Sequence, residues 1–181
     1  MVTIRDAGSA DAAAIAAIYN EGIEERTATF ETAPRTSADV EGWLAAGRRR
    51  PVLVATEDGT VRGWARIAPY SERPAYAGVG EVSVYVERTA RGRGIGSALL
   101  TGLAGRGEEL GYWKLTSKVF TDNAASSALV RRCGWREVGT HLSHGRLDGR
   151  WRDVVVVERL LGEASRSREL QAPWGGAPPP P

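Results

Sequence analysis

The sequence predicts one α/β domain with a mixed sheet and helices on its faces, in the order β-α-α-β-β-β-α-β-α-β-β. Segments of strand-like alternation are interleaved with segments of helical periodicity, which is typical of this fold class. Asp58-Gly59 and Asp148-Gly149 each lie between two strand-like runs, and Asp-Gly is a strong hairpin signal. The chain has 181 residues, 42% of them hydrophobic, which is enough for one domain with its own core.

The N-terminal third predicts one strand, two helices and a hairpin. "VTIRDA" alternates like a strand, and Ser9 is placed to cap the helix in "SADAAAIAAIYNEGIEE". After a loop, "SADVEGWLAAGRR" predicts a second helix, with Thr36 or Ser37 as its N-cap. "PVLVATEDGTVRGWARIAPY" then predicts two strands around Asp58-Gly59.

The rest of the domain continues the alternation. A loop, "SERPAYAGVG", leads into the strand "EVSVYVE", and the next helix is expected to begin between Gly94 and Ser97. "YWKLTSKVF" predicts a strand, "NAASSALVRRCG" a helix, and two final strands flank Asp148-Gly149. After Leu161 the chain is polar and rich in Gly and Pro, so it cannot bury enough apolar surface to offset chain entropy. We therefore expect a domain of residues 1–161 and a disordered tail of residues 162–181.

Composition and charge weigh against several functions. The net charge is +2 and the arginines are dispersed except at Arg48–Arg50, which is interpreted as a solvated helix end, so no nucleic-acid surface is expected. No apolar run approaches the ~20 residues that span a bilayer, and a charged residue interrupts the place of a signal peptide's apolar region. We therefore expect a cytoplasmic protein without membrane contact.

Cysteine and histidine give no sign of a metal centre or a disulfide. Cys133 is the only cysteine and lies in an apolar-periodic stretch, which predicts a buried structural thiol. His141 and His144 are the only histidines, and a zinc site would need both on one face. Their segment is not helical in pattern, and a strand does not provide that arrangement, so no metal is expected.

The stretch "RGRGIG", residues 91–96, is the most informative motif. It could be only a glycine-rich turn that caps a helix. A dinucleotide fingerprint fails because the glycines are spaced G-x-G-x-G, and a P-loop fails because no Gly-Lys-Ser/Thr follows. A third interpretation is a diphosphate cradle, in which backbone N–H groups at a helix N-terminus bind an anion beside Arg91 and Arg93.

The third interpretation coincides with a family resemblance. R-x-x-G-x-G, met by Arg91, Gly94 and Gly96, resembles the acyl-CoA signature of the GNAT N-acetyltransferase superfamily. "IYNEGIEERTATF", "APYSERPAYAGVGEVSVYV" and "DGRWRDVVVVERL" are similar to its phosphinothricin and arsinothricin N-acetyltransferase branch, over residues 2–161. The resemblance implies the GNAT fold, acetyl-CoA as co-substrate, and direct acetyl transfer to the α-amine of a small amino-acid-like toxin. A peptide N-terminus or another amine as acceptor, or acyl-CoA binding without catalysis, remain alternatives.

The resemblance also implies roles for residues. Glu81 corresponds to the general base of the branch, although from the residue alone it could be an exposed strand-end glutamate. The backbone of Val84, Tyr85 and Val86 would bind the pantetheine arm and the thioester. The residues implied in binding the rest of the cofactor are Arg91, Gly92, Arg93, Gly94, Ile95, Gly96, Ser97, Asn123 and Ser126.

The acceptor side is implied less completely. Arg73 and Tyr76 match substrate-binding positions of the branch, and Phe30 matches a position that walls the pocket. Val130 stands where many GNAT enzymes have a tyrosine that protonates the leaving thiolate, so the general acid stays unidentified. Relatives that pair through their last strands imply a homodimer.

Overall fold

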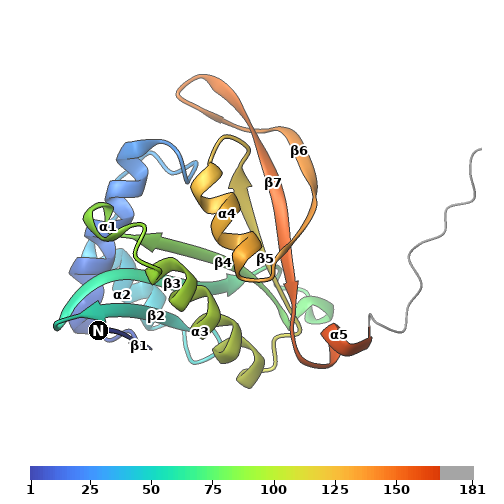
Figure 1. Cartoon of the computed structure of the whole chain (residues 1–181), viewed down its shortest axis with the longest axis horizontal. Coiled ribbons are helices and arrows are strands. Elements are labelled where there is room, and N and C mark those ends of the chain that lie inside the picture. Colours follow the sequence, from blue (N-terminus) through green and yellow to red (C-terminus); the bar gives the residue numbers. More distant parts are fainter. Residues whose placement is uncertain (168–181) are drawn as a thin grey trace, which may run out of the picture.

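The computed structural model describes residues 1–167 and contains one seven-stranded sheet in the order β1-β2-β3-β4-β5-β7-β6. All neighbouring strands are antiparallel except β4 and β5, which are parallel. The strands are β1 (Val2–Asp6), β2 (Val52–Glu57), β3 (Thr60–Pro69), β4 (Val79–Val86), β5 (Lys114–Phe120), β6 (Arg136–Leu147) and β7 (Arg150–Leu160). The predicted order of long elements and the α/β fold class are confirmed (Figure 1).

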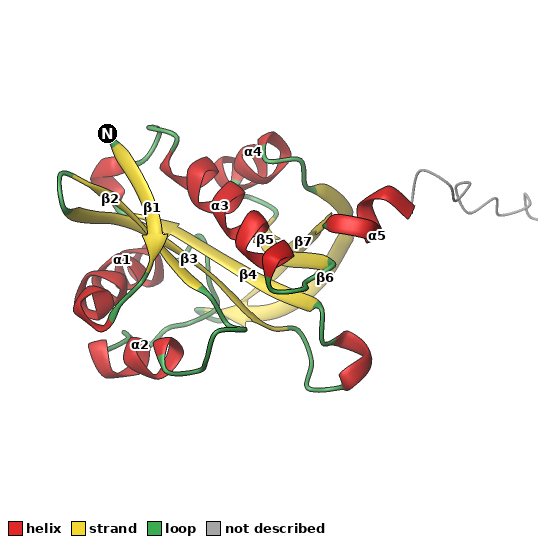
Figure 2. Cartoon of the chain, turned by 90° about the horizontal axis from the view of Figure 1, so that it is seen from below, coloured by secondary structure: helices red, strands yellow, loops and turns green. Residues whose placement is uncertain are grey.

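Helices cover both faces of the sheet. Figure 2 shows α1 and α2 on one face and α3 and α4 on the other. The helices are α1 (Ala12–Glu25), α2 (Ser37–Leu44), α3 (Ile95–Glu109), α4 (Ala124–Arg132) and α5 (Gly162–Ser167), with short 3-10 turns η1 (Ser9–Asp11), η2 (Pro74–Tyr76) and η3 (Arg88–Ala90). Within residues 1–167, no helix is both long enough and apolar enough to cross a membrane.

Two apolar clusters hold these layers together. On one face, Leu99 and Leu103 of α3 are fully buried against the sheet, because α3 repeats its apolar residues at helical spacing. On the other face, Ile15 and Tyr19 of α1 pack with Trp64 of β3. Each large buried side chain contributes about 1.5–3 kcal/mol relative to exposure. The sheet is therefore fixed from both sides around β3 and β4.

The helix caps follow one prediction and correct another. The hydroxyl of Thr36 accepts the Asp39 amide (3.2 Å), which confirms Thr36 as the cap of α2. Ser9 does not cap α1, which begins only at Ala12. Instead the carboxylate of Asp11 accepts the Gly8 amide (2.8 Å) and pairs with Arg5 (2.7 Å). A buried carboxylate held by a cation binds this amide more strongly than a hydroxyl does.

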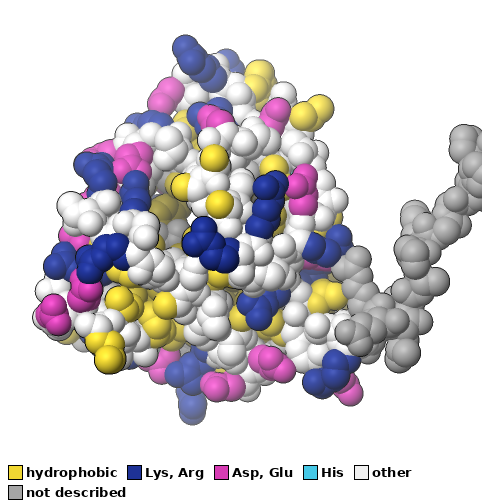
Figure 3. All heavy atoms as spheres, viewed as in Figure 1, with side chains coloured by type: hydrophobic (Ala, Val, Ile, Leu, Met, Phe, Trp, Pro, Cys, Tyr) yellow, Lys and Arg dark blue, Asp and Glu magenta, His cyan; other side chains and the backbone are white. Residues whose placement is uncertain are grey.

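The arginine run does not end a helix, which corrects its interpretation. α2 stops at Leu44, and Gly47 follows with φ of 94°, a left-handed conformation that ends helical continuation. Arg49 donates to the carbonyl of Ala77 (3.0 Å), so the run contacts the loop before β4. On the face in Figure 3, cationic and acidic side chains are interspersed.

The two Asp-Gly hairpins are confirmed, and the predicted tail starts differently. Asp148 and Gly149 have φ of 48° and 77°, the left-handed pair that a two-residue hairpin turn needs. Residues 162–167, expected to be disordered, form the short helix α5, which places Glu163 in its first turn and Arg166 in its last. These charges suit the helix dipole. The remaining expected tail, residues 168–181, lies outside the described residues.

A bulge in β6 changes the placement of the histidines. Its register with β7 shifts between His141 and Gly145, and Ser143 there has φ of 48°. The Nδ1 atoms of His141 and His144 consequently lie 3.3 Å apart, so the expectation that a strand separates them is wrong. Among residues 1–167, no three metal-ligating side chains form a group. Cys133 is free and buried, as predicted.

The feature that positions the site is the divergence of β4 from β5. The two strands pair only over Val79–Glu81 and Lys114–Thr116. Beyond Glu81, β4 stays paired with β3 as far as Val86, whereas its other edge has no strand partner in the described chain. Ser117 Oγ donates to the Val82 carbonyl (2.9 Å) where the strands part. The sheet therefore opens on one side of β4.

Candidate active site

Two adjoining cavities occupy the opening between β4 and β5. The larger, about 590 Å³, is bounded by β4, the turn before α3 and the start of α4. In Figure 1, the C-terminal part of α1 and α4 lie on either side of β4, and Gly22 and Glu25 of α1 line this cleft. The smaller, about 320 Å³, lies between β4 and β5 and reaches β7 at Val154. We call them the large cleft and the inner cavity.

The glycine-rich turn forms one end of the large cleft. Gly94 is the N-cap of α3 with φ of 82°, a conformation that favours glycine. A Cβ on Gly96 would lie 3.0 Å from Leu129 of α4, so glycine permits the close approach of the two helices. The first amides of a helix have no intrahelical partner, and within residues 1–167 those of Gly96 and Ser97 donate no backbone hydrogen bond. This end of the cleft can bind an anion.

The two arginines of the motif are engaged by carboxylates. Arg91 pairs with Glu25 (2.9 Å) and donates to the Val86 carbonyl (3.1 Å), while Arg93 pairs with Glu57. Burial raises the pKa of Glu25, but hydrogen bonds from Arg88 and Arg91 outweigh that effect and hold its pKa below the ordinary value. Arg91 is therefore fixed beside the glycine-rich turn, and part of its charge is balanced.

The apolar and aromatic side chains near the end of β4 pack into the two apolar clusters. Val84 and Val86 pack against the α3 cluster, and Tyr85 points to the other face, where it stacks on Trp64 with ring centroids 5.0 Å apart. Burial raises the pKa of Tyr85 above its ordinary value, so this phenol stays protonated. β4 therefore presents to the large cleft its backbone atoms and the side chains of Val84, Tyr85 and Val86.

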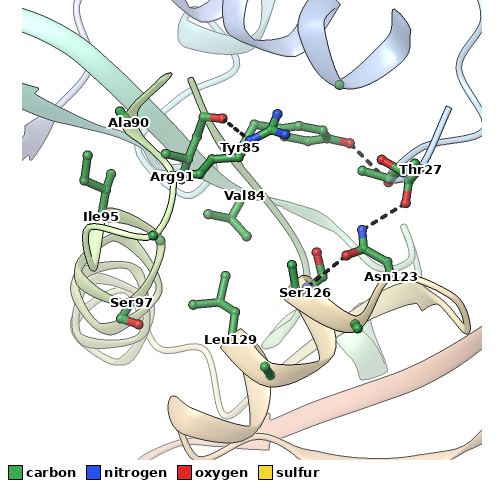
Figure 4. A pocket seen from close by; sticks show the side chains of 18 of the residues that line it. Thr27, Val84, Tyr85, Ala90, Arg91, Ile95, Ser97, Asn123, Ser126 and Leu129 are labelled. Atoms are coloured by element: carbon green, nitrogen blue, oxygen red, sulfur yellow. Dashed lines mark hydrogen bonds between the residues drawn. The ribbon is translucent and has the colours of Figure 1, made fainter. Parts of the chain in front are cut away.

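Asn123 joins the start of α4 to the loop after α1, as Figure 4 shows. Its Oδ1 accepts the Ser126 amide (2.9 Å), which makes Asn123 the N-cap of α4. Its Nδ2 donates to the carbonyl of Thr27 (2.9 Å), in the loop after α1. Asn123 and Ser126 line both cavities, together with Val84 and Tyr85. The two cavities therefore share a wall.

The inner cavity contains the predicted carboxylate. Glu81 lies at the last position of β4 that pairs with β5. Its Oε1 accepts a hydrogen bond from Lys118 Nζ of β5 (2.7 Å). Both side chains are more than a third exposed, so solvent reaches them. Phe30 lines the same cavity and packs edge-on against Phe120 (centroids 4.8 Å apart). Val130 also lines it and cannot donate a proton.

The structure does not bring every predicted residue together. Arg73 and Tyr76 precede β4, in and beside η2, and line neither cavity. Tyr76 is 40% exposed and contacts Tyr70 instead (centroids 5.7 Å apart). Lys118 and Glu25 line these cavities, but neither was predicted from the sequence to be a site residue. Lys118 is one of two lysines in β5, which also contains Thr116 and Ser117, so no local pattern distinguished it, and nothing local marked Glu25.

Comparison with known proteins gives consistent results. A model of the acetyltransferase (GNAT) family matches residues 15–135. The L-methionine sulfoximine/L-methionine sulfone acetyltransferase of Pseudomonas paraeruginosa is 35% identical, over 88% of this chain and 94% of that protein. The phosphinothricin N-acetyltransferase of Streptomyces coelicolor is 34% identical, over 88% and 96%. A solved GNAT superfamily phosphinothricin acetyltransferase from Sinorhizobium meliloti, in complex with acetyl-CoA, is 33% identical with a TM-score of 0.84, over 98% and 96%.

Proposed function

This chain belongs to the acetyltransferase (GNAT) family, and we propose that it transfers the acetyl group of acetyl-CoA to the α-amine of a small, anionic amino-acid-like compound. The proposed acceptor class is that of phosphinothricin, arsinothricin and methionine sulfoximine, whose acetylation would remove their toxicity. One observation carries the proposal: the cavity that contains Glu81 adjoins the cleft that contains the glycine-rich turn, through a shared wall.

The large cleft suits acetyl-CoA. Free amides at the start of α3 and the nearby Arg91 suit the diphosphate, and the unpaired edge of β4 offers backbone groups to the amide-containing arm. Asn123 and Ser126 lie where that arm would pass toward the inner cavity. Acetyl-CoA, when bound, supplies an activated acetyl thioester. We propose Gly92, Arg93, Gly94, Ile95, Gly96 and Ser97 as further contacts of the phosphate end.

Glu81 is the proposed general base. An aliphatic amine is mostly protonated at neutral pH, so a carboxylate in the cavity is needed to accept the proton before the amine attacks. Glu81 is ionisable, reachable by water and on the β4 strand whose backbone borders both cavities. The amine attacks the acetyl thioester directly where the two cavities meet, so no covalent enzyme intermediate is needed. The thiolate leaves without help from Val130, so we propose that water protonates it.

A homodimer is part of the proposal. β6 is one of the two edge strands of the sheet, and Leu142 (76% exposed) and Trp151 (62% exposed) extend from the β6–β7 hairpin. An edge strand with exposed large apolar side chains is suited to a second copy of the chain. Light scattering on the purified protein would give twice the 19.4 kDa chain mass, and a single chain mass would refute this part.

The function is tested by release of free thiol from acetyl-CoA. The acceptor panel contains phosphinothricin, methionine sulfoximine, proteinogenic amino acids, a short peptide and an aminoglycoside. Turnover on the first two, at a kcat/KM above that on the peptide and the aminoglycoside, is the expected result. A preference for the peptide would assign the family's activity to a protein N-terminus instead. Acetyl-CoA binding without turnover on any amine would indicate a binding module.

A further inference from the structure

We propose that Lys118 binds the α-carboxylate of the acceptor, beside Glu81, which receives its α-amine. This inference rests on the proposed function and names how the inner cavity selects its substrate. It starts from the ion pair that bridges the opening between β4 and β5 (Nζ to Oε1, 2.7 Å). The pair stands where the two strands have just ceased to be hydrogen-bonded, so its two charges face a cavity instead of a sheet neighbour.

Lys118 is the cation available to an anionic acceptor. Among the described residues that line the inner cavity, it is the only lysine or arginine. The family-implied Arg73 lies outside this cavity. Glu31 also lines it, but its carboxylate is bound by Arg35 (2.6 Å), whose side chain is not part of the lining. A carboxylate entering the cavity therefore has one permanent positive charge to pair with.

The chemistry of an α-amino acid fits this arrangement. Its ammonium and carboxylate are bonded to the same carbon, so its binding site needs a negative and a positive group side by side. Glu81 and Lys118 are such a pair. On binding, their mutual contact is exchanged for one contact from Glu81 to the ammonium and one from Lys118 to the carboxylate. A second acidic group on the acceptor's side chain lies several bonds away and would not reach both residues.

Solvent exposure makes the exchange feasible. Both side chains are partly exposed, at 37% for Lys118 and 38% for Glu81, so their ion pair is weak and can be opened by a competing ligand. Lys118 has no other hydrogen-bond partner within residues 1–167 that would have to be broken. The lysine is therefore free to change partners when a zwitterion enters.

The test is a cycle of two proteins and two acceptors. Wild type and Lys118→Met are assayed with methionine sulfoximine and with its α-carboxamide, which keeps the amine and the side chain but lacks the carboxylate. We expect Lys118→Met to lower kcat/KM for the acid about 10–100-fold more than for the carboxamide, the range of one charge-assisted contact. KM for acetyl-CoA should not change. Lys118→Arg should recover most of the discrimination between acid and amide.

The cycle separates binding from indirect effects. Loss of the lysine alters the surroundings of Glu81, and the two acceptors differ in how far they depend on a base. The losses that Glu81→Gln shows on the same two acceptors measure this indirect effect, and the effect of Lys118→Met must exceed it. Equal losses for acid and carboxamide would overturn the role of Lys118 while leaving the proposed function intact. A wild type that acetylates no α-amino acid but another amine would overturn both. An unchanged melting temperature of Lys118→Met, measured alongside, shows that the variant is folded.

Discussion

Replacing Glu81 by glutamine removes the proposed general base while keeping the size of the side chain and a hydrogen-bond acceptor. The variant cannot take a proton from the ammonium of the acceptor. General-base catalysis contributes about 10²–10⁴-fold in rate. Because the Glu81 side chain is 38% exposed, water in the cavity can replace part of its function. We therefore expect a loss of kcat of about 10²–10³-fold, equivalent to about 3–4 kcal/mol in activation free energy.

The assay follows thiol release over a pH series, with phosphinothricin as acceptor. The deficit of Glu81→Gln should shrink as pH rises toward the pKa of the acceptor amine, because a growing fraction of the amine is then already deprotonated. Glu87→Gln is the matched control. It removes the same charge just after the same strand, from an ion pair of the same length with Arg62 (2.7 Å), and Glu87 lines neither cavity. Its activity should stay within about twofold of wild type.

Two results would refute the assignment of Glu81. An unchanged kcat in Glu81→Gln would show that no proton passes through this residue. A deficit that is constant across the pH series would show that the carboxylate acts by charge or packing and not as a base. In either case KM for acetyl-CoA serves as the internal check that the large cleft is intact.

Three further predictions concern the scaffold. Asn123→Ala should destabilise the fold by about 1 kcal/mol through loss of the helix cap and raise KM for acetyl-CoA; an unchanged KM would remove Asn123 from the cofactor contacts. Leu99→Ala should cost about 2–5 kcal/mol in urea unfolding, since the side chain is fully buried, and a cost below 1 kcal/mol would contradict its core position. Glu158→Gln should cost about 2 kcal/mol at pH 7, because the buried carboxylate binds two cations. Burial raises the pKa of Glu158, but these cations outweigh that effect and hold it below 4.5. Its stabilisation is therefore present above that pH and is lost as pH falls through the folded-state pKa, and a difference from wild type that does not decrease as pH falls below 4.5 would contradict this.

The fold was largely predictable because its signals are local. The Asp-Gly turns, the Thr36 cap and the switch from alternation to helical period near Gly94 each depend on neighbouring residues. The failures involve contacts distant in sequence or a local competitor. Ser9 does not cap α1 because it begins a 3-10 turn before that helix, and the Asp11 carboxylate binds the Gly8 amide and Arg5 there. The run Arg48–Arg50 lies outside α2, because Gly47 adopts a left-handed conformation and directs the chain toward the loop before β4.

The site was predictable where a motif fixes the backbone, and less so where side chains from different strands meet. The glycine-rich turn and Asn123 were placed correctly at the starts of α3 and α4. The partner of Glu81 depends on the register of β4 against β5, which no local pattern specifies. The same holds for the pair His141–His144, because a bulge in β6 displaces the backbone between them.

The wall between the two cavities sets a limit on how this protein can diversify. Val84, Asn123 and Ser126 border both cavities, so a substitution there changes both of the proposed binding sites at once. Phe30 and Lys118 border only the inner cavity. Changes at Phe30 and Lys118 can therefore alter the inner cavity, where we propose that the acceptor binds, without altering the large cleft proposed for acetyl-CoA. Mutant libraries restricted to such positions should retain far more active members than libraries that include the wall.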